Sequence, residues 1–103
     1  MLIAHSVDGV PIRLTKERWD HICRRHPELA NQQEKVVETL RNPTEVLQGD
    51  FGEKLAVRFY RRTPLTSKYL TVAYKELGTQ DGFVVTAYFT RRVAIWRQRI
   101  WKQ

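Results

Sequence analysis

Hydrophobic residues recur at two different spacings in this chain, and the change of spacing separates a helical first part from a strand-forming second part. One apolar face follows the i, i+3, i+4, i+7 spacing of a helix and consists of Trp19, Ile22, Cys23 and His26. Thr15 offers a hydroxyl N-cap before this face, and Pro27 disfavours helical backbone at the residue that precedes it. A helix is therefore predicted from Lys16 to His26.

A second helix is predicted from about Gln32 to Arg41. Val36, Val37 and Leu40 supply its apolar stripe. The Asn42-Pro43 pair that follows cannot continue a helix, so the chain should leave helical geometry there.

From residue 54 onward, apolar and polar residues alternate with the period of a β-strand. The strands predicted for the sheet are Thr44–Gln48, Lys54–Arg61, Tyr69–Glu76 and Phe83–Thr90, and a short apolar stretch at Ile12–Leu14 is a candidate opening strand. Short turns join the four main strands, which favours antiparallel pairing. The tail from Arg91 to Gln103 fits either a helix, with Val93, Trp96 and Ile100 on one face, or a further strand, and the helix is favoured.

This order predicts a single α+β domain spanning residues 1–103. Two N-terminal helices should pack on one face of a roughly four-stranded antiparallel sheet, followed by a basic, helical C-terminal tail. The other face of the sheet should remain partly open, and function is expected there.

Strand parity predicts which side chains occupy each face. Those predicted to face the helices are Leu55, Val57, Phe59, Leu70, Val72, Tyr74, Phe83, Val85, Ala87 and Phe89. The chemically interesting side chains predicted for the open face are Arg58, Tyr60, Thr71, Lys75, Thr86 and Tyr88. Cations and phenols suit RNA, because cations hold phosphates and aromatic rings stack on unpaired bases. An ordinary solvated sheet face would carry similar residues.

Charge strengthens the RNA interpretation. The 103 residues carry a net charge of +7, but residues 1–50 have a net charge of −1 and residues 51–103 one of +8. A strong positive field favours nucleic acid as the partner. The alternative explanations are a solubility charge or an interface for an acidic protein, and a membrane surface is less favoured. With no long apolar run, no secretory signal and one cysteine, a small cytoplasmic domain without membrane contact is expected.

The histidine segment has the most unusual composition in the chain. Arg18, His21 and Arg25 fall on one side of the first predicted helix, where a neutral His21 imidazole would be a candidate general base. His26 lies elsewhere around the helix, but the break at Pro27 would free its side chain. Alternatively, His21 is merely solvated and His26 is buried or caps the helix. Cys23 and His26 have metal-ligand spacing, but no second ligand pair accompanies them, so neither a metal nor a cofactor is expected.

Four segments together resemble small phage- and toxin-associated members of the barnase-, EndoU-, colicin- and RelE-like nuclease superfamily: Leu14–Ile22, Arg25–Glu28, Leu40–Pro43 and Phe83–Tyr88. The resemblance covers about residues 12–101 and implies metal-free RNA cleavage on the open sheet face. Residue by residue, it matches the superfamily's histidines to His21 and His26, its strand cation to Arg58 or Lys75, and its last-strand hydroxyl pair to Thr86 and Tyr88.

The leading hypothesis is a metal-independent, toxin-like endoribonuclease that leaves a 2′,3′-cyclic phosphate. Its predicted catalytic residues are His21, His26, Arg58, Lys75, Thr86 and Tyr88. Its predicted RNA-binding residues are Arg18, Arg25, Tyr60, Arg61, Arg62, Arg91 and Arg92. The alternatives are a non-catalytic RNA-binding module and a domain that docks an acidic partner such as an antitoxin or immunity protein.

Overall fold

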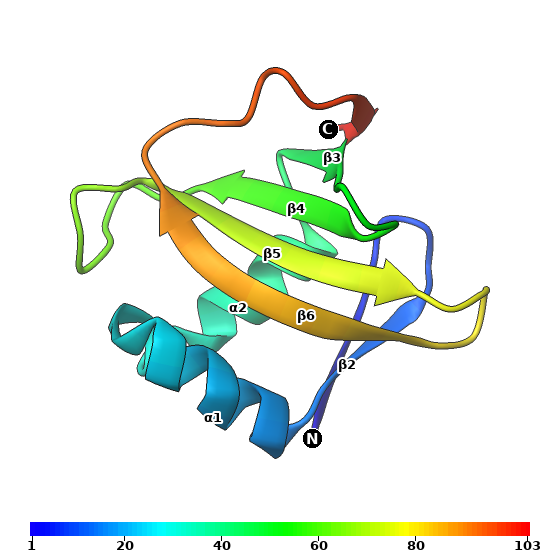
Figure 1. The fold of residues 1–103 in the computed structure, drawn as a ribbon, viewed down its shortest axis with the longest axis horizontal. Helices are drawn as coiled ribbons and strands as arrows, with labels where there is room; N and C mark the ends of the chain where they lie inside the picture. Colours follow the sequence, from blue (N-terminus) through cyan, green and yellow to red (C-terminus); the bar gives the residue numbers. More distant parts are fainter.

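The computed structural model describes residues 1–103 and contains two α-helices and seven strands (Figure 1). The helices are α1 (Lys16–Arg25) and α2 (Gln33–Arg41), joined by a short 3₁₀ turn η1 (Pro27–Leu29). The strands are β1 (Leu2–His5), β2 (Pro11–Leu14), β3 (Glu45–Gln48), β4 (Lys54–Phe59), β5 (Tyr69–Glu76), β6 (Gly82–Thr90) and β7 (Arg99–Lys102).

Both helices form where the sequence predicts them. The Thr15 hydroxyl accepts a hydrogen bond from the Arg18 backbone N–H at 3.1 Å, which caps the start of α1. At its other end His26 leaves helical geometry, with φ −133°, because Pro27 follows. Neither helix is long and apolar enough to cross a membrane.

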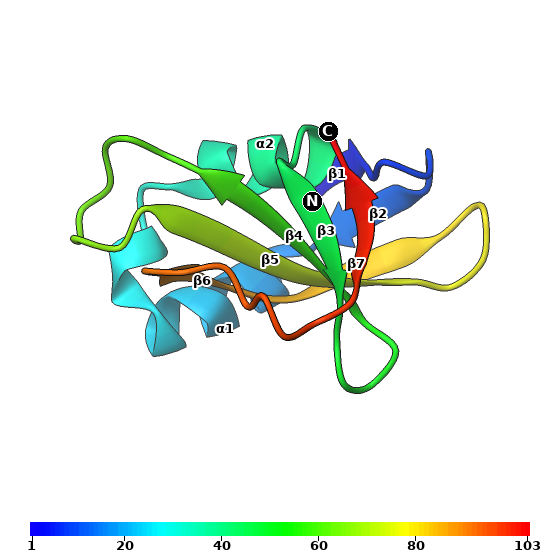
Figure 2. The ribbon, with the colours of Figure 1, turned by 90° about the horizontal axis from the view of Figure 1, so that it is seen from above.

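The seven strands form one mixed sheet in the order β1-β2-β6-β5-β4-β3-β7 (Figure 2). The antiparallel meander from β3 to β6 matches the prediction. The four-stranded, purely antiparallel sheet is wrong in detail, because β2 pairs in parallel with the start of β6 and β1 adds an outer strand. The candidate opening strand at Ile12–Leu14 is present as β2, whereas the four residues of β1 carry too little periodicity to be recognised from sequence.

The C-terminal tail is not a helix. Segment 91–98 crosses the sheet in extended and turn conformations, and Arg99–Lys102 then forms β7 against β3. Pairing with β3 satisfies backbone groups that β3 would otherwise expose, and this long-range contact outweighs the helical spacing of Val93, Trp96 and Ile100.

The main core lies between the helices and the sheet. Ile22 from α1 and Val36 and Leu40 from α2 are fully buried there. From the sheet, the buried residues of this core include Ala56, Leu70, Val72, Tyr74, Val84 and Ala87. Figure 1 shows both helices on this side of the sheet and segment 91–98 on the other.

A second, smaller apolar cluster lies on the opposite face. It consists of Leu47, Leu55, Val57 and Ala73, with Val93 and Ala94 of segment 91–98 packed against it. This face, called the outer face below, is therefore partly covered by the chain's own C-terminal part.

The side chains of β4 and of the first residues of β6 consequently face the side opposite to the prediction, whereas the rest of β6 faces as predicted. In β4, Leu55 and Val57 face outward and Ala56 faces the helices. In β6, a bulge beside Ala73 and Tyr74 shifts the register, so that Val84 enters the main core and Val85 packs on the outer face. The prediction was wrong because it assumed that only one face of the sheet is apolar.

Candidate functional site

The outer face carries a set of hydroxyl groups on β5 and β6. Cross-strand neighbours share a face, and Tyr88 lies opposite Thr71 while Thr86 lies opposite Ala73. Thr71, Thr86 and Tyr88 therefore occupy the outer face, as predicted. Burial raises the pKa of the Tyr88 phenol, with nearby Arg97 opposing the shift and Glu53 adding to it. The phenol thus keeps its proton near neutral pH and is available as a hydrogen-bond donor.

His26 approaches Tyr88 from the end of α1. Its backbone N–H donates to the Ile22 carbonyl at 2.7 Å, so His26 caps the helix through its main chain. The two rings lie with their centroids 6.0 Å apart and their planes tilted by 37°. On the side away from β5, β6 is paired with β2 only at Gly82 and Phe83, so its later edge is open to this contact.

A carboxylate lies beside His26 on the side of the 3₁₀ turn. Oε1 of Glu28 is 3.6 Å from the imidazole Nδ1. The Glu28 side chain therefore lies within ion-pair distance of the His26 ring.

A pocket of about 200 Å³ separates Tyr88 from segment 91–98. Its polar lining comes from Thr71, Tyr88, Thr90, Arg92 and Arg97, and Trp96 closes part of it. The Thr90 hydroxyl oxygen is buried and has no hydrogen-bond partner. An unpaired polar atom in a pocket is available to a ligand.

The two pocket arginines differ in what they contact. Arg97 donates two hydrogen bonds to the Asp50 carboxylate, at 2.8 and 3.0 Å. These hydrogen bonds lower the pKa of Asp50 and fix segment 91–98 over β3. Arg92 is exposed and has no carboxylate within 4.0 Å. Its guanidinium is therefore free to meet an anion.

The sequence did not identify Arg97, Thr90 or Trp96 as residues of this pocket. Trp96 was assigned to the apolar face of a helix that does not form. The available signal was one tryptophan among four arginines between residues 91 and 99.

Arg58 and Tyr60 are not on the outer face, which corrects the prediction. Arg58 donates to the Asn42 carbonyl at 2.6 Å, and its Nε lies 3.6 Å from Glu38 Oε1. The Tyr60 hydroxyl donates to Glu38 Oε1 at 2.8 Å, and burial raises the pKa of this phenol. Both side chains instead join β4 to α2.

His21 and Lys75 lie apart from Tyr88. His21 lines an open, wholly polar hollow on α1 with Arg18 and Arg24. Arg25 is exposed at the end of the same helix. Lys75 is on the outer face, but four residues along β5 from the partner of Tyr88, which is roughly 13 Å at the rise of a strand.

Five cations gather where β4 and β6 end, a region called the basic end below: Arg61, Arg62, Lys68, Arg91 and Arg92. Figure 1 shows loop 61–68 and the end of β6 together at this end of the sheet. None of these five side chains makes an ion pair or a hydrogen bond within the chain.

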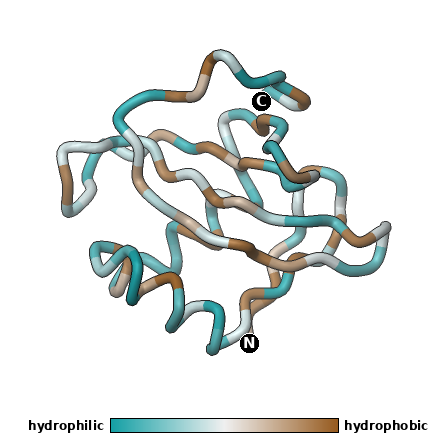
Figure 3. Tube along the Cα trace, in the orientation of Figure 1, coloured by the Kyte–Doolittle hydropathy of each residue, from teal (hydrophilic) through white to brown (hydrophobic).

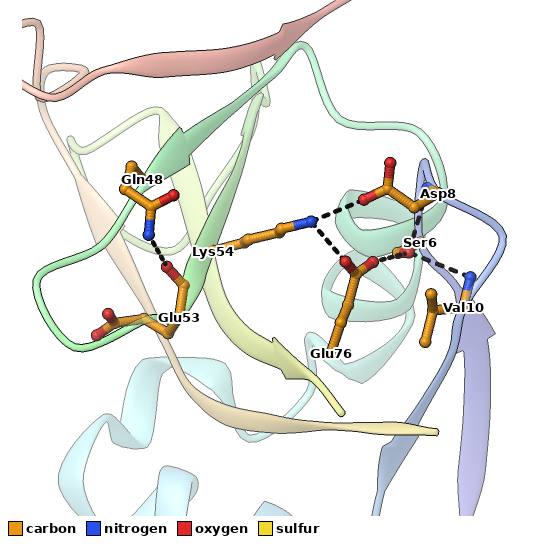
Figure 4. Close-up of polar contacts among 7 residues, drawn as sticks. All are labelled: Ser6, Asp8, Val10, Gln48, Glu53, Lys54 and Glu76. Carbon is orange, nitrogen blue, oxygen red and sulfur yellow. Dashed lines mark hydrogen bonds and ion pairs between the residues drawn. The ribbon is translucent and has the colours of Figure 1, made fainter. Parts of the chain in front are cut away.

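At the opposite end of the sheet, where β4 begins and β5 ends, charged groups are paired (Figure 4). Lys54 donates to Asp8 at 2.8 Å and to Glu76 at 2.5 Å, and the Ser6 hydroxyl donates to Glu76 at 2.6 Å. Burial opposes the charge on Lys54, but these two acceptors outweigh it and raise the pKa of Lys54. Arg13 pairs with Asp81 at 2.8 Å. This region is called the network end.

No group of three or more His, Cys, Asp or Glu side chains comes together in a way that could hold a metal ion. Cys23 belongs to α1 and is half-buried, and burial raises the pKa of its thiol.

Comparison of the chain with known protein families, with curated proteins and with solved structures finds no match. The nuclease resemblance therefore stays a prediction.

Proposed function

We propose that the protein is a metal-independent, toxin-like endoribonuclease that acts in the cytoplasm. One observation carries the proposal: the rings of His26 and Tyr88, from distant parts of the chain, meet at the open edge of β6. A titratable base next to a protonated phenol, beside a pocket lined by arginines, is a suitable arrangement for moving protons around a phosphodiester.

In the proposed step, His26 accepts the proton of a ribose 2′-hydroxyl, and the 2′-oxygen attacks the adjacent phosphorus. The bond from phosphorus to the 5′-oxygen breaks as the new bond forms, and Tyr88 gives its phenolic proton to the departing oxygen. The products are a 2′,3′-cyclic phosphate and a 5′-hydroxyl. Water then carries the proton from His26 back to Tyr88, which restores both groups.

Arg92 is the proposed contact for the phosphate oxygens, whose negative charge is concentrated in the transition state. A guanidinium placed there before the reaction stabilises that charge without reorganising. Thr86 and Thr90 supply hydroxyls on the same face for positioning. His21, Arg58 and Lys75 have no step in this scheme, because each lies away from the Tyr88 pocket.

The test is incubation of the purified protein with total RNA in EDTA, followed by analysis of fragment ends for 2′,3′-cyclic phosphate. His26→Ala should lower the cleavage rate by about 10²–10⁴-fold, the usual contribution of a general base. His21→Ala is the matched control on the same helix and should cleave at nearly the rate of the unmodified protein. Equal loss in both variants would reject the site.

Intact RNA under all conditions would reject the enzyme. Retention of that RNA on the protein would then support a non-catalytic RNA-binding module. As a toxin-like enzyme, the protein would be neutralised by an acidic antitoxin or immunity protein that covers the same basic surface.

A further inference from the structure

Segment 91–98 holds a tryptophan in solvent. The Trp96 side chain is 80% exposed and its neighbour Ile95 is 88% exposed. The other two tryptophans, Trp19 and Trp101, pack against the main core. Tryptophan is highly buried on average in folded proteins, so a ring presented in this way calls for a binding partner.

The local backbone explains why Trp96 points outward. Val93 and Ala94 occupy the positions that face the second apolar cluster. The Ile95 N–H then donates to the Val93 carbonyl and the Arg97 N–H to the Ala94 carbonyl, at 2.9 and 3.0 Å, which places Ile95 and Trp96 in a turn. Arg97 and Asp50 anchor this turn from below, so the ring is presented by a fixed support.

The surroundings of Trp96 are positive. An open groove of about 860 Å³ runs along the segment, and its charged lining residues are four arginines and one glutamate. Arg91, Arg92 and Arg99 are exposed and have no carboxylate within 4.0 Å. Figure 3 shows the segment as hydrophobic in its middle and hydrophilic at each end. A flat aromatic ring between unpaired guanidinium groups combines the two features that bind single-stranded nucleic acid.

We infer that segment 91–99 binds single-stranded RNA, with an unpaired base stacked on Trp96 and flanking phosphates held by Arg91, Arg92 and Arg99. A duplex keeps the faces of its bases covered, so only an unpaired nucleotide offers a surface to the ring. The inference rests on the proposed function and deepens it, since a base held on Trp96 directs the neighbouring Tyr88 pocket to unpaired stretches of RNA.

The test uses the full chain and a fluorescein-labelled 12-nucleotide RNA with 2′-O-methyl groups, which lacks the attacking hydroxyl and cannot be cleaved. Fluorescence anisotropy gives its affinity as a single strand and as a duplex. Trp96→Ala should weaken single-strand binding by about 5- to 150-fold, the range measured for one stacked base. Trp96→Phe, which keeps a ring, should recover most of the affinity.

Ile95→Ala is the matched control, because it removes an equally exposed apolar side chain that has no aromatic face. It should leave the affinity nearly unchanged, and Trp96→Ala should not alter duplex binding. Equal affinity for single strand and duplex, or equal losses from both alanine variants, would overturn the inference. Displacement of the RNA by polyglutamate at equal charge would also overturn it, since the surface would then be a general polyanion site.

These experiments distinguish a wrong role for Trp96 in RNA binding from a wrong assignment of nuclease activity. The methylated RNA reports binding alone, so an inactive protein can still discriminate between single strand and duplex. Conversely, cyclic-phosphate products with an unchanged affinity for Trp96→Ala would reject the stacking role and leave the nuclease in place.

Discussion

The two ends of the sheet contain similar numbers of charged side chains and use them differently. At the network end, Lys54 lies 2.5 and 2.8 Å from two carboxylates, and Arg13 has its own aspartate. At the basic end, none of the five cations has a carboxylate within 4.0 Å. Paired charges join strands to one another, whereas unpaired charges remain available to a ligand.

The difference originates in the turns. The β1–β2 turn contributes Asp8, and the strands and turn around residue 80 contribute Glu76 and Asp81. Loop 61–68 and the residues after β6 contain no acidic side chain. Recognition of a ligand therefore depends less on the net charge of the chain than on the end of the sheet where the cations have no acidic partner.

After His26→Ala, the largest effect is expected at Tyr88. Tyr88→Phe keeps the ring against His26 but removes the proton donor, so RNA cleavage should fall by about 10²–10³-fold, the usual cost of losing one transition-state donor. Single-turnover cleavage kinetics measure this directly. Unchanged kinetics would show that the phenol takes no part in the chemistry.

A smaller effect on stability is expected at the network end. Lys54→Met keeps the apolar stem but leaves Asp8 and the 12%-exposed Glu76 side chain facing each other without a cation. Unfolding in urea should show a loss of about 1–2 kcal/mol. Arg92→Gln at the basic end should change the free energy of unfolding by less than about 0.5 kcal/mol.

The same two variants should rank in the opposite order when RNA affinity is measured in place of stability. Arg92→Gln should weaken RNA binding and reduce its dependence on salt, because one phosphate contact is lost. Lys54→Met should leave RNA affinity unaltered. If both variants lose stability or both lose affinity, the two ends are not functionally distinct.

The smallest effect is expected on the stability of the fold at acidic pH. The hydrogen bond from Lys54 lowers the pKa of Asp8 below its ordinary value. The folded protein therefore binds this proton less readily than the unfolded chain, and the resulting stabilisation is present above about pH 4 and is lost as pH falls. Since the Asp8 side chain is 49% exposed, the contribution is well under about 1 kcal/mol.

Thermal unfolding of the unmodified protein and of Asp8→Asn should therefore differ most near neutral pH and converge in acid. A difference that stays constant with pH would mean that Asp8 acts through its shape and not through its charge.

The sequence was sufficient for the elements that have strong local signals. Thr15 and Pro27 bound α1 as expected, and the meander from β3 to β6 follows from the apolar strands and the short turns that join them. The parity of β4 was not predictable in the same way. Leu55, Ala56 and Val57 are all buried, so the alternation itself does not say which face meets the helices.

The site was predictable only where it lies on β6 and at the end of α1. Tyr88 and Thr86 face outward as predicted, and His26 was recognised as free of the helix because of Pro27. The contributions of Arg97 and Trp96 depend on a tail that crosses the sheet, a long-range contact without a local signature. Arg58 was misplaced for a related reason, because its partners Asn42 and Glu38 belong to α2 and its end.

The attachment of β7 has a consequence for motion. β7 has four residues and pairs only with β3, whereas β5 is paired along both sides. Separating β7 from the sheet breaks few hydrogen bonds and leaves most of the main core intact, so this opening requires less free energy than global unfolding. The backbone amides of β7 and segment 91–98 should therefore exchange with solvent as one unit, ahead of those in the central strands, and each such opening uncovers the face that holds Tyr88.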